Sequence, residues 1–357
     1  MKVSVGLHRY AIEDWEETTR LALEAERLGV DSLWTAEAWA HDAATPLAYL
    51  AAKTTRLKLG TGIMQVGTRT PALVAMTAMT LDSMSGGRFL LGLGTSGPQV
   101  IEGWHGNPFD RPIQRTREII EICRRIFQGE TLAYEGQLYT LPLPGGEGKA
   151  LRPGAPPTPN LKIYVASLGP RNLRMTGELA DGWLGTSFLP ETAETFIGPI
   201  REGARAAGRS LAELDLQAGG TVWFTDDPER AAEALKPGLA FSLGAMGSQQ
   251  HNFYNDAYRR QGFADEAREV QRLWLSGHRD EARRRVPTEL VLSTNLIGDE
   301  ETVRARLRDY RDAGITTFRA GLRGTTLDER LETLGRVIGL VEALNREGAP
   351  ASAPGQR

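Results

Sequence analysis

Features that would indicate several other classes of protein are scarce or missing in this sequence. Its 357 residues include one cysteine, Cys123, so no disulfide can form within the chain, and we expect this thiol to pack as a small buried hydrophobe. No apolar run approaches the ~20 residues that a membrane span requires, and residues 1–10 lack the apolar core of a secretory signal. The formal net charge of -3 gives no reason to expect a nucleic acid or a membrane as partner. We therefore expect a cytoplasmic protein.

The motifs of three common kinds of site are missing as well. There is no H-x-x-H, C-x-x-C or carboxylate cluster with the spacing of metal ligands, so we expect no metal site. There is no G-x-S-x-G, which excludes hydrolases that carry their nucleophile in that motif. Gly6 is followed by Leu7-His8-Arg9, so the first strand lacks the glycine-rich phosphate fingerprint of an open, doubly wound dinucleotide-binding sheet.

What the sequence does have is a regular alternation of short β-type runs with amphipathic helical runs. Glycine and proline mark the boundaries, as at Gly29 after the first helix and at Pro46 and Pro71, which open later helices. This alternation favours parallel strands with right-handed crossovers, and eight strands are the number that closes a (β/α)8 TIM barrel. The expected strands are residues 3–7, 31–35, 57–63, 88–93, 162–166, 182–185, 216–225 and 316–322.

Two insertions interrupt this rhythm. Residues 134–160 are rich in proline and glycine, which excludes a helix or a central strand, whereas residues 237–295 have a mostly helical, charged pattern. Long insertions at a barrel mouth vary with function, so we expect substrate selectivity to lie in these two segments. We expect residues 1–347 to form a single barrel domain and residues 348–357 a disordered tail.

The active site of such a barrel is built from the loops at the C-terminal ends of its strands. Glu37 follows the second strand in an otherwise apolar segment, where a carboxylate needs a function or a partner such as a nearby arginine. His8 follows the first strand, and it and His105 are able to transfer protons near neutral pH, although a lone histidine is more often structural. Trp39 and Trp104 are candidates for the walls of an aromatic cofactor site, with core packing as the alternative.

Glycine and hydroxyl residues gather in the loops after the fourth and fifth strands, at residues 94–99 and 166–172. Glycine lets backbone N–H groups approach an anion closely, and the N-terminus of the following helix favours negative charge. Ser167, Gly169 and Asn172, with Arg171 beside them, therefore form a candidate phosphate cradle. An ordinary strand-to-helix turn has the same composition, and spacing alone does not decide between the two.

Six segments of the chain resemble the luciferase-like flavin oxidoreductases, and above all the branch that uses coenzyme F420, an 8-hydroxy-5-deazaflavin. The longest match, GLGTSGPQVIEGWHG, covers residues 92–106. The others are WTAEAW at 34–39, ASLGPRN at 166–172, ADGW at 180–183, NFYN at 252–255 and DAGI at 312–315. Each motif is modest alone, but their number and their order, spread over residues 3–345, make the resemblance specific.

The resemblance implies a (β/α)8 barrel with insertions, usually dimeric, that binds F420. It implies a non-proline cis peptide at Gly62-Ile63 behind the deazaflavin ring, with Glu37 near that ring. It also implies that the tail and phosphate of the cofactor are bound at the positions that match Gly94, Thr95, Ser96, Ala166, Ser167, Leu168, Gly169, Pro170, Arg171 and Asn172.

The chain departs from one branch of this family. The sugar-phosphate dehydrogenases place a catalytic carboxylate just after the glycines of strand four and a histidine after the acid of strand two. This chain has residues 97–99, Gly-Pro-Gln, and Ala38 at those places, so sugar-phosphate oxidation is not expected. A proton donor would come from His8, Glu102 or His105.

We predict hydride transfer between C5 of F420 and a small organic substrate that the sequence does not identify. Glu37 would orient or polarise the ring, and His8 or His105 would move a substrate proton. An FMN-dependent monooxygenase on the same barrel is the first alternative, and a non-catalytic barrel that binds a ligand is the second. We expect a homodimer.

Overall fold

The computed structural model describes residues 1–7, 14–246 and 252–347, so His8 and the expected tail lie outside the described residues. Eight parallel strands form a barrel, which closes because the first and last of them pair with each other. This confirms the predicted (β/α)8 fold. In order around the barrel, the strands are β1 (Lys2–Gly6), β2 (Ser32–Thr35), β3 (Lys58–Thr61), β5 (Phe89–Gly94), β8 (Lys162–Ala166), β9 (Gly182–Leu184), β10 (Asp215–Ala218) and β13 (Thr317–Leu322).

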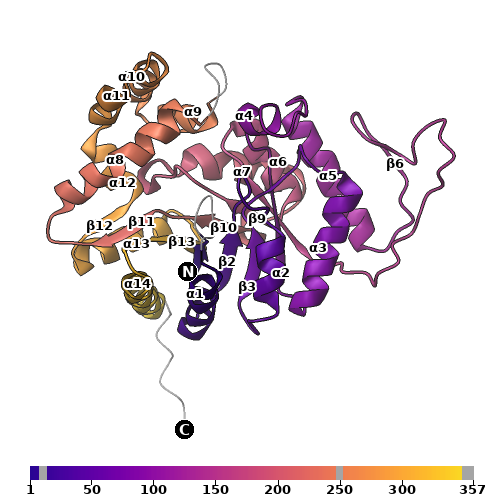
Figure 1. The fold of residues 1–357 in the computed structure, drawn as a ribbon, viewed down its shortest axis with the longest axis horizontal. Helices are drawn as coiled ribbons and strands as arrows, with labels where there is room; N and C mark the ends of the chain where they lie inside the picture. Colours follow the sequence, from indigo (N-terminus) through magenta and orange to yellow (C-terminus); the bar gives the residue numbers. More distant parts are fainter. Residues whose placement is uncertain (8–13, 247–251, 348–357) are drawn as a thin grey trace, which may run out of the picture.

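Helices surround the barrel (Figure 1). No helix in the described ranges is long and apolar enough to cross a membrane. The helices of the barrel units are α1 (Trp15–Leu28), α2 (Thr45–Ala51), α3 (Pro71–Ser85), α4 (Pro98–Ile101), α5 (Pro112–Phe127), α6 (Pro170–Leu179), α7 (Glu194–Ala206), α8 (Pro228–Gly244), α13 (Glu300–Asp312) and α14 (Leu327–Glu347), with short 3-10 turns at Pro190–Thr192 and Leu211–Glu213.

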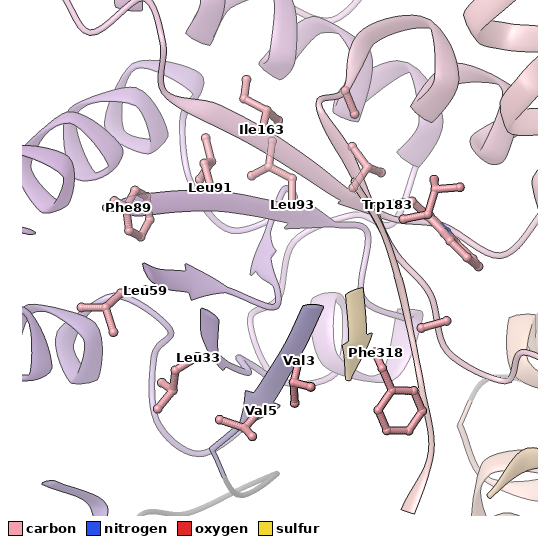
Figure 2. Packing of buried hydrophobic residues seen from close by; sticks show 14 of the residues in the cluster. Val3, Val5, Leu33, Leu59, Phe89, Leu91, Leu93, Ile163, Trp183 and Phe318 are labelled. Atoms are coloured by element: carbon pink, nitrogen blue, oxygen red, sulfur yellow. The ribbon is translucent and has the colours of Figure 1, made fainter. Parts of the chain in front are cut away.

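The main hydrophobic core lies between the outer face of the barrel and these helices. Alternate strand residues point outward into it, among them Val3, Leu33, Leu91 and Phe318 (Figure 2). Cys123 on α5 is fully buried, as predicted, and burial raises the pKa of its thiol to about 12. This thiol is therefore a packing group rather than a nucleophile.

Two aromatic side chains fill the inside of the barrel. Trp34 on β2 and Tyr164 on β8 are nearly fully buried and meet edge to face, with their ring centroids 5.2 Å apart. Glycines on neighbouring strands make room for them: a Cβ on Gly60 would lie 2.3 Å from the Trp34 ring, and one on Gly182 would lie 2.2 Å from the Tyr164 ring. This aromatic pair, called here the floor, separates the two ends of the barrel interior.

A polar network closes the end of the barrel below this floor. Asp215, at the start of β10, accepts hydrogen bonds from Thr317 Oγ1 (2.7 Å), Gln217 Nε2 (2.8 Å) and Tyr164 OH (3.0 Å), and it pairs with Lys2. Burial would raise the pKa of Asp215, but Lys2 and hydrogen bonds from Thr316, Thr317 and Gln217 lower it instead. The N-terminal end of the strands is thus a structural base, and the active site of such a barrel is expected at the opposite, C-terminal end.

The structure differs from the expectation around the seventh strand and the segment that follows it. The predicted seventh strand, 216–225, is two strands, β10 and β11 (Thr221–Phe224), which both pair with β13. The break falls at Gly219-Gly220, because a Cβ on Gly219 would lie 2.0 Å from the carbonyl oxygen of residue 319. A third short strand, β12 (Leu296–Gly298), extends this edge and was not predicted. Helix α8 continues through Pro237 to Gly244 and so extends into the second insertion, whose expected start was residue 237.

The second insertion is helical, as predicted, and has its own hydrophobic cluster. It contains α9 (Phe253–Arg260), α10 (Ala264–Leu275), α11 (Arg279–Arg285) and α12 (Thr288–Thr294). Two consecutive side chains at the end of α9 form hydrogen bonds with the loops of the barrel. Arg260 Nη2 donates to the Leu168 carbonyl (2.5 Å), and Gln261 Nε2 donates to the Ser187 carbonyl (2.6 Å). This insertion therefore reaches the loops that follow β8 and β9.

The first insertion does not lie at the barrel mouth, which corrects our expectation for residues 134–160. It begins with a hairpin of β6 (Tyr134–Glu135) and β7 (Thr140–Leu141) that packs on the outer side of α5, across the molecule from α8–α12 (Figure 1). The buried Glu118 carboxylate of α5 holds the hairpin turn, accepting the N–H groups of residues 137, 138 and 139. Within one chain, this hairpin therefore lies beside α5 and away from the mouth of the barrel.

Candidate functional site

The four segments predicted to bind a cofactor lie side by side at the C-terminal ends of β2, β3, β5 and β8. Gly62 N donates to the Thr35 carbonyl (2.6 Å), which places the end of β3 beside the end of β2. The chain then forms the short strand β4 (Met64–Gln65), which pairs with β5, and Gly94 at the end of β5 pairs with Ala166 at the end of β8. Segments 37, 62–63, 94–96 and 166–172 thus form one continuous arc.

The centre of this arc is the Gly62-Ile63 peptide. It is cis, as the resemblance implied, and a second cis peptide precedes Pro142 in the distant hairpin. The Ile63 side chain lies against Gly94, since a Cβ on Gly94 would come within 2.8 Å of Ile63 Cγ1. Gly94 is therefore needed for the close approach of β5 to this segment.

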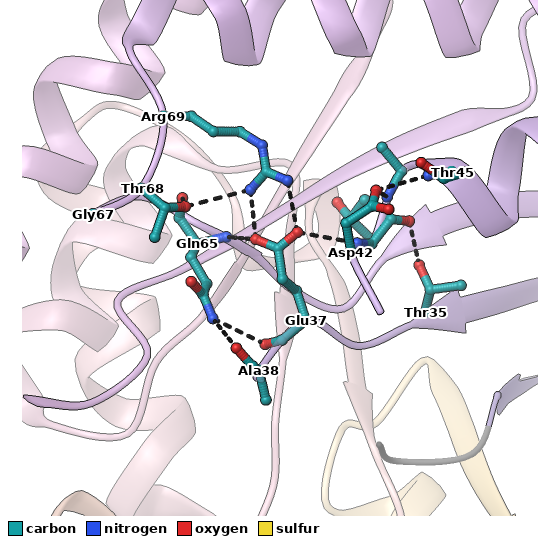
Figure 3. Close-up of polar contacts among 12 residues, drawn as sticks. Thr35, Glu37, Ala38, Asp42, Thr45, Gln65, Gly67, Thr68 and Arg69 are labelled. Atoms are coloured by element: carbon teal, nitrogen blue, oxygen red, sulfur yellow. Dashed lines mark hydrogen bonds and ion pairs between the residues drawn. The ribbon is translucent and has the colours of Figure 1, made fainter. Parts of the chain in front are cut away.

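Glu37 has an arginine partner, which confirms the alternative left open by the sequence. Arg69 donates from Nη1 to Oε1 and from Nη2 to Oε2 (2.7 Å), a bidentate pair in which 8% of the Glu37 side chain and 18% of the Arg69 side chain are exposed (Figure 3). The same carboxylate accepts the backbone N–H groups of Ala43 (3.0 Å) and Gln65 (3.2 Å).

Gln65 continues this network on the other side of the cis peptide. The residue is fully buried, and its Nε2 donates to the carbonyl oxygens of Glu37 (3.3 Å) and Ala38 (3.2 Å). Its Oε1 is buried with no partner in the described structure. A buried acceptor without a donor is costly, so this oxygen is a place where a bound molecule or a water could donate a hydrogen bond.

The β5 loop leaves the arc through a tight turn. Ser96 has a positive φ of 57°, and Thr95 Oγ1 donates to the Ser96 carbonyl (3.2 Å) before α4 begins at Pro98. His105 follows α4 on an exposed turn, and Glu102 there accepts the Phe109 N–H (3.2 Å). His105 is thus at the rim rather than inside the arc.

The two tryptophans predicted to wall a cofactor site are both exposed, 43% for Trp39 and 65% for Trp104. The alternative of core packing is therefore wrong for both. Their places after β2 and after α4 put them beside the arc, on the same two loops that carry Glu37 and His105.

In the β8 loop the backbone, rather than Ser167, is open to an anion. The Ser167 hydroxyl is buried and hydrogen-bonded to Thr176 Oγ1 (2.8 Å) on α6. Helix α6 starts at Pro170 with no side-chain cap, so its first N–H groups remain available, and the exposed Arg171 has no ion-pair partner in the described ranges. Asn172 Oδ1 is buried without a partner, and such an acceptor suits a hydroxyl group better than a phosphate.

Sequence reasoning missed three side chains around this arc and a fourth inside the barrel. Arg69 and Gln65 lie in the stretch after the third strand, where nothing in one sequence indicates their pairing with Glu37. Arg260 comes from an insertion far along the chain. Arg319 on β13 pairs in register with Ser4, whose side chain faces Gln217 inside the barrel, so it shares that inward side. Alternation along the last strand was a signal that could have identified Arg319.

These residues fit an extended ligand with a planar ring and an anionic tail. Ile63 and Gly94 offer a close-packed surface beside buried acceptors, and the uncapped end of α6 with Arg171 and Arg260 offers positive potential one strand away. Over the part of the chain that the structure describes, no group of three or more His, Cys, Asp or Glu residues could hold a metal ion.

Comparisons with known proteins agree with this arrangement. The family model "Luciferase-like monooxygenase" matches residues 1–317. Rv3520c of Mycobacterium tuberculosis, a proposed coenzyme F420-dependent oxidoreductase, is 40% identical over 324 residues, covering 88% of this chain and 93% of that protein. The F420-dependent glucose-6-phosphate dehydrogenase of Kineococcus radiotolerans is 29% identical over 311 residues, or 83% of each chain.

Solved structures of related enzymes superpose on most of this chain and so support the same barrel fold. The coenzyme F420-dependent tetrahydromethanopterin reductase of Methanopyrus kandleri superposes with a TM-score of 0.78 at 25% identity, covering 94% of this chain and 98% of that one. An F420-dependent secondary alcohol dehydrogenase superposes with a TM-score of 0.71 at 20% identity, covering 96% and 99% of the two chains, which supports the fold alone. The match over residues 1–317 and the 40% identical relative establish that this chain belongs to the luciferase-like monooxygenase family.

Proposed function

We propose that this protein is a coenzyme F420-dependent oxidoreductase that transfers a hydride between the deazaflavin and a small organic substrate. The observation that carries the proposal is the continuous arc of residues 37, 62–63, 94–96 and 166–172 at the C-terminal ends of four neighbouring strands. Its support is the named cofactor of the relatives, above all of the 40% identical mycobacterial protein.

In this proposal the chain positions the cofactor and supplies its surroundings. Bound F420 would supply a carbon that accepts or donates a hydride. Ile63, packed on Gly94, would back the ring, while Gly94, Thr95 and Ser96 would line the path from the ring to the tail. The uncapped N-terminus of α6 and Arg171 would hold the phosphate, and Asn172 Oδ1 would accept from a hydroxyl of the sugar-like chain.

A proton on the substrate would be handled by one of two histidines. His105 follows α4 on an exposed turn, and His8 follows β1 in the sequence, so both remain candidates. His105→Gln and His8→Gln separate them, because loss of the true donor removes one limb of the pH–rate profile and loss of the other does not.

The decisive experiment is titration of the purified protein with F420 and with FMN, followed by fluorescence and thermal shift. We expect saturable F420 binding and little or no FMN binding. Tight FMN binding without F420 binding, followed by oxygen consumption, would replace this proposal with an FMN-dependent monooxygenase. Binding of neither cofactor would leave a barrel that binds another ligand without redox chemistry.

We further propose that residues 1–347 act as one domain and that two copies form a cytoplasmic homodimer. Exposed apolar side chains on the outer face of α3 support the dimer, namely Leu73, Met76 and Met84, which are 48%, 61% and 52% exposed. Light scattering of the wild type and of Met76→Arg tests the dimer, and cell fractionation tests the location.

A further inference from the structure

We propose that Arg69 is a positioning residue and that its ion pair with Glu37 acts as a latch between the β2 loop and the 62–69 segment. In this inference, which rests on the proposed function, Glu37 exchanges no proton with substrate or cofactor. The pair instead fixes the backbone that would carry the ring of the cofactor.

The first step is that the Glu37 carboxylate has no hydrogen-bonding capacity to spare. Two guanidinium N–H groups and two backbone N–H groups bind its two oxygens, and 8% of the side chain is exposed. A general base needs a lone pair aimed at the reacting proton, and a polarising group needs contact with the ring. Donors of the protein itself therefore occupy the four acceptor positions of the Glu37 carboxylate.

The second step is that these four donors come from two separate segments. Ala43 N lies at the far end of the β2 loop, whereas Gln65 N and Arg69 lie beyond the cis peptide on the β4 side (Figure 3). Gln65 Nε2 adds two hydrogen bonds back to the β2 loop. Gln65 is two residues from Ile63, so a change in the latch shifts the surface on which the ring would rest.

A third step extends the latch to the next loop. Asn107 Nδ2 donates to the Gly67 carbonyl (3.0 Å), and a Cβ on Gly67 would lie 3.1 Å from the Ile101 side chain. The 62–69 segment is therefore held between the β2 loop and the turn after α4. The latch and these contacts thus connect the β2 loop, the 62–69 segment and the loop after β5.

Nearby carboxylates favour the charged form of the arginine in the latch. The Glu37 hydrogen bond raises the pKa of Arg69, with the charges of Glu37 and Asp42 adding to the effect. Asp42 is the other acid facing Arg69: burial would raise its pKa, but hydrogen bonds from Thr45 and Ala44 lower it. Removal of either partner leaves a poorly hydrated charge in place, which costs more than removal of both.

The test combines hydrogen exchange with cofactor binding in Arg69→Met, Glu37→Gln, the double variant and the conservative Arg69→Lys. Arg27→Met is the matched control, because it removes a single exposed ion pair on α1. In the protein without cofactor, we expect Arg69→Met to speed exchange in residues 37–45 and 62–69 together, by about tenfold, while Arg27→Met leaves both segments unchanged.

For F420, we expect about a tenfold weaker Kd in Arg69→Met and in Glu37→Gln, no further loss in the double variant, and partial recovery in Arg69→Lys. The absorption spectrum of the bound cofactor should equal that of the wild type in every variant. An altered bound spectrum in Glu37→Gln with normal exchange in Arg69→Met would overturn the inference, because Glu37 would then act on the ring directly. Exchange that increases in one segment alone would also overturn it.

The two proposals fail in different ways. If the wild type binds no F420, the proposed function fails, whereas the latch is still decided by exchange in the cofactor-free protein. Should Arg69→Met not fold, Arg69→Lys supplies the same comparison, since it keeps the charge but loses the bidentate geometry.

Discussion

Gly94→Ala is the substitution for which the structure gives the clearest expectation. Its new Cβ would lie 2.8, 3.1 and 3.2 Å from Cγ1, Cγ2 and Cβ of Ile63, whereas ordinary contact begins at 3.4 Å. Ile63 would have to retreat by about 0.6 Å, and its β-branched side chain cannot do so by changing rotamer alone. The backbone beside the cis peptide must therefore move.

Overpacking of this kind costs about 1–3 kcal/mol. For Gly94→Ala we expect F420 to bind with about a tenfold weaker Kd, which corresponds to a loss of about 1.4 kcal/mol in binding free energy. We also expect the melting temperature to fall by about 2–4 °C. Fluorescence titration and thermal unfolding measure the two effects on the same preparation.

Gly97→Ala is the matched control in the same loop. Its φ of -137° suits alanine, and its Cβ would meet nothing closer than Gln99 Oε1 at 3.7 Å. We expect a change in Kd of less than about twofold. If Gly94→Ala bound F420 as tightly as the wild type, or if both variants weakened binding equally, Ile63 would not be the surface on which the ring rests.

Three further predictions concern other parts of the fold. Glu118→Gln should destabilise the protein by about 2 kcal/mol at pH 7 in urea unfolding. Hydrogen bonds outweigh burial and lower the pKa of Glu118, so the difference from wild type should shrink as the pH falls below the ordinary glutamate pKa of about 4.3, and vanish below the lowered pKa of the folded protein. Arg260→Gln should speed proteolysis of the helical insertion by about tenfold, because it removes the link to the β8 loop, while Arg259→Gln, which breaks an exposed pair, should not. Gly60→Ala should cost about 2–4 kcal/mol of unfolding free energy, since the Trp34 ring occupies the space of the new methyl group, and Trp34→Leu should recover part of that loss.

The fold was largely predictable because the hydrophobic pattern of a barrel is local. Seven of the eight barrel strands were placed within a few residues of their observed bounds. The seventh was not, because the apolar run 216–225 continues through two glycines, and only the approach of β13 reveals that the chain breaks there. The position of residues 134–160 was also misjudged, since composition identifies a loop but not the helix against which it packs.

The site was predictable in its parts but not in its connections. The resemblance located Glu37, Gly62-Ile63 and the two glycine-rich loops, and the structure brings these four segments together. It could not show that Arg69 binds Glu37, because that contact depends on two loops meeting in space. Ser167 illustrates the same limit: its position matched a phosphate site, yet its hydroxyl is bonded to Thr176.

The aromatic floor inside the barrel has a consequence for how this scaffold can change over time. Trp34 and Tyr164 each occupy space that a glycine on a neighbouring strand leaves open, so a change of size at one position requires a compensating change at another. Such paired changes are rare in the course of mutation, whereas single changes in the loops above the floor are tolerated individually. New substrate preferences should therefore arise from substitutions in the loops, while the residues of the aromatic floor change little.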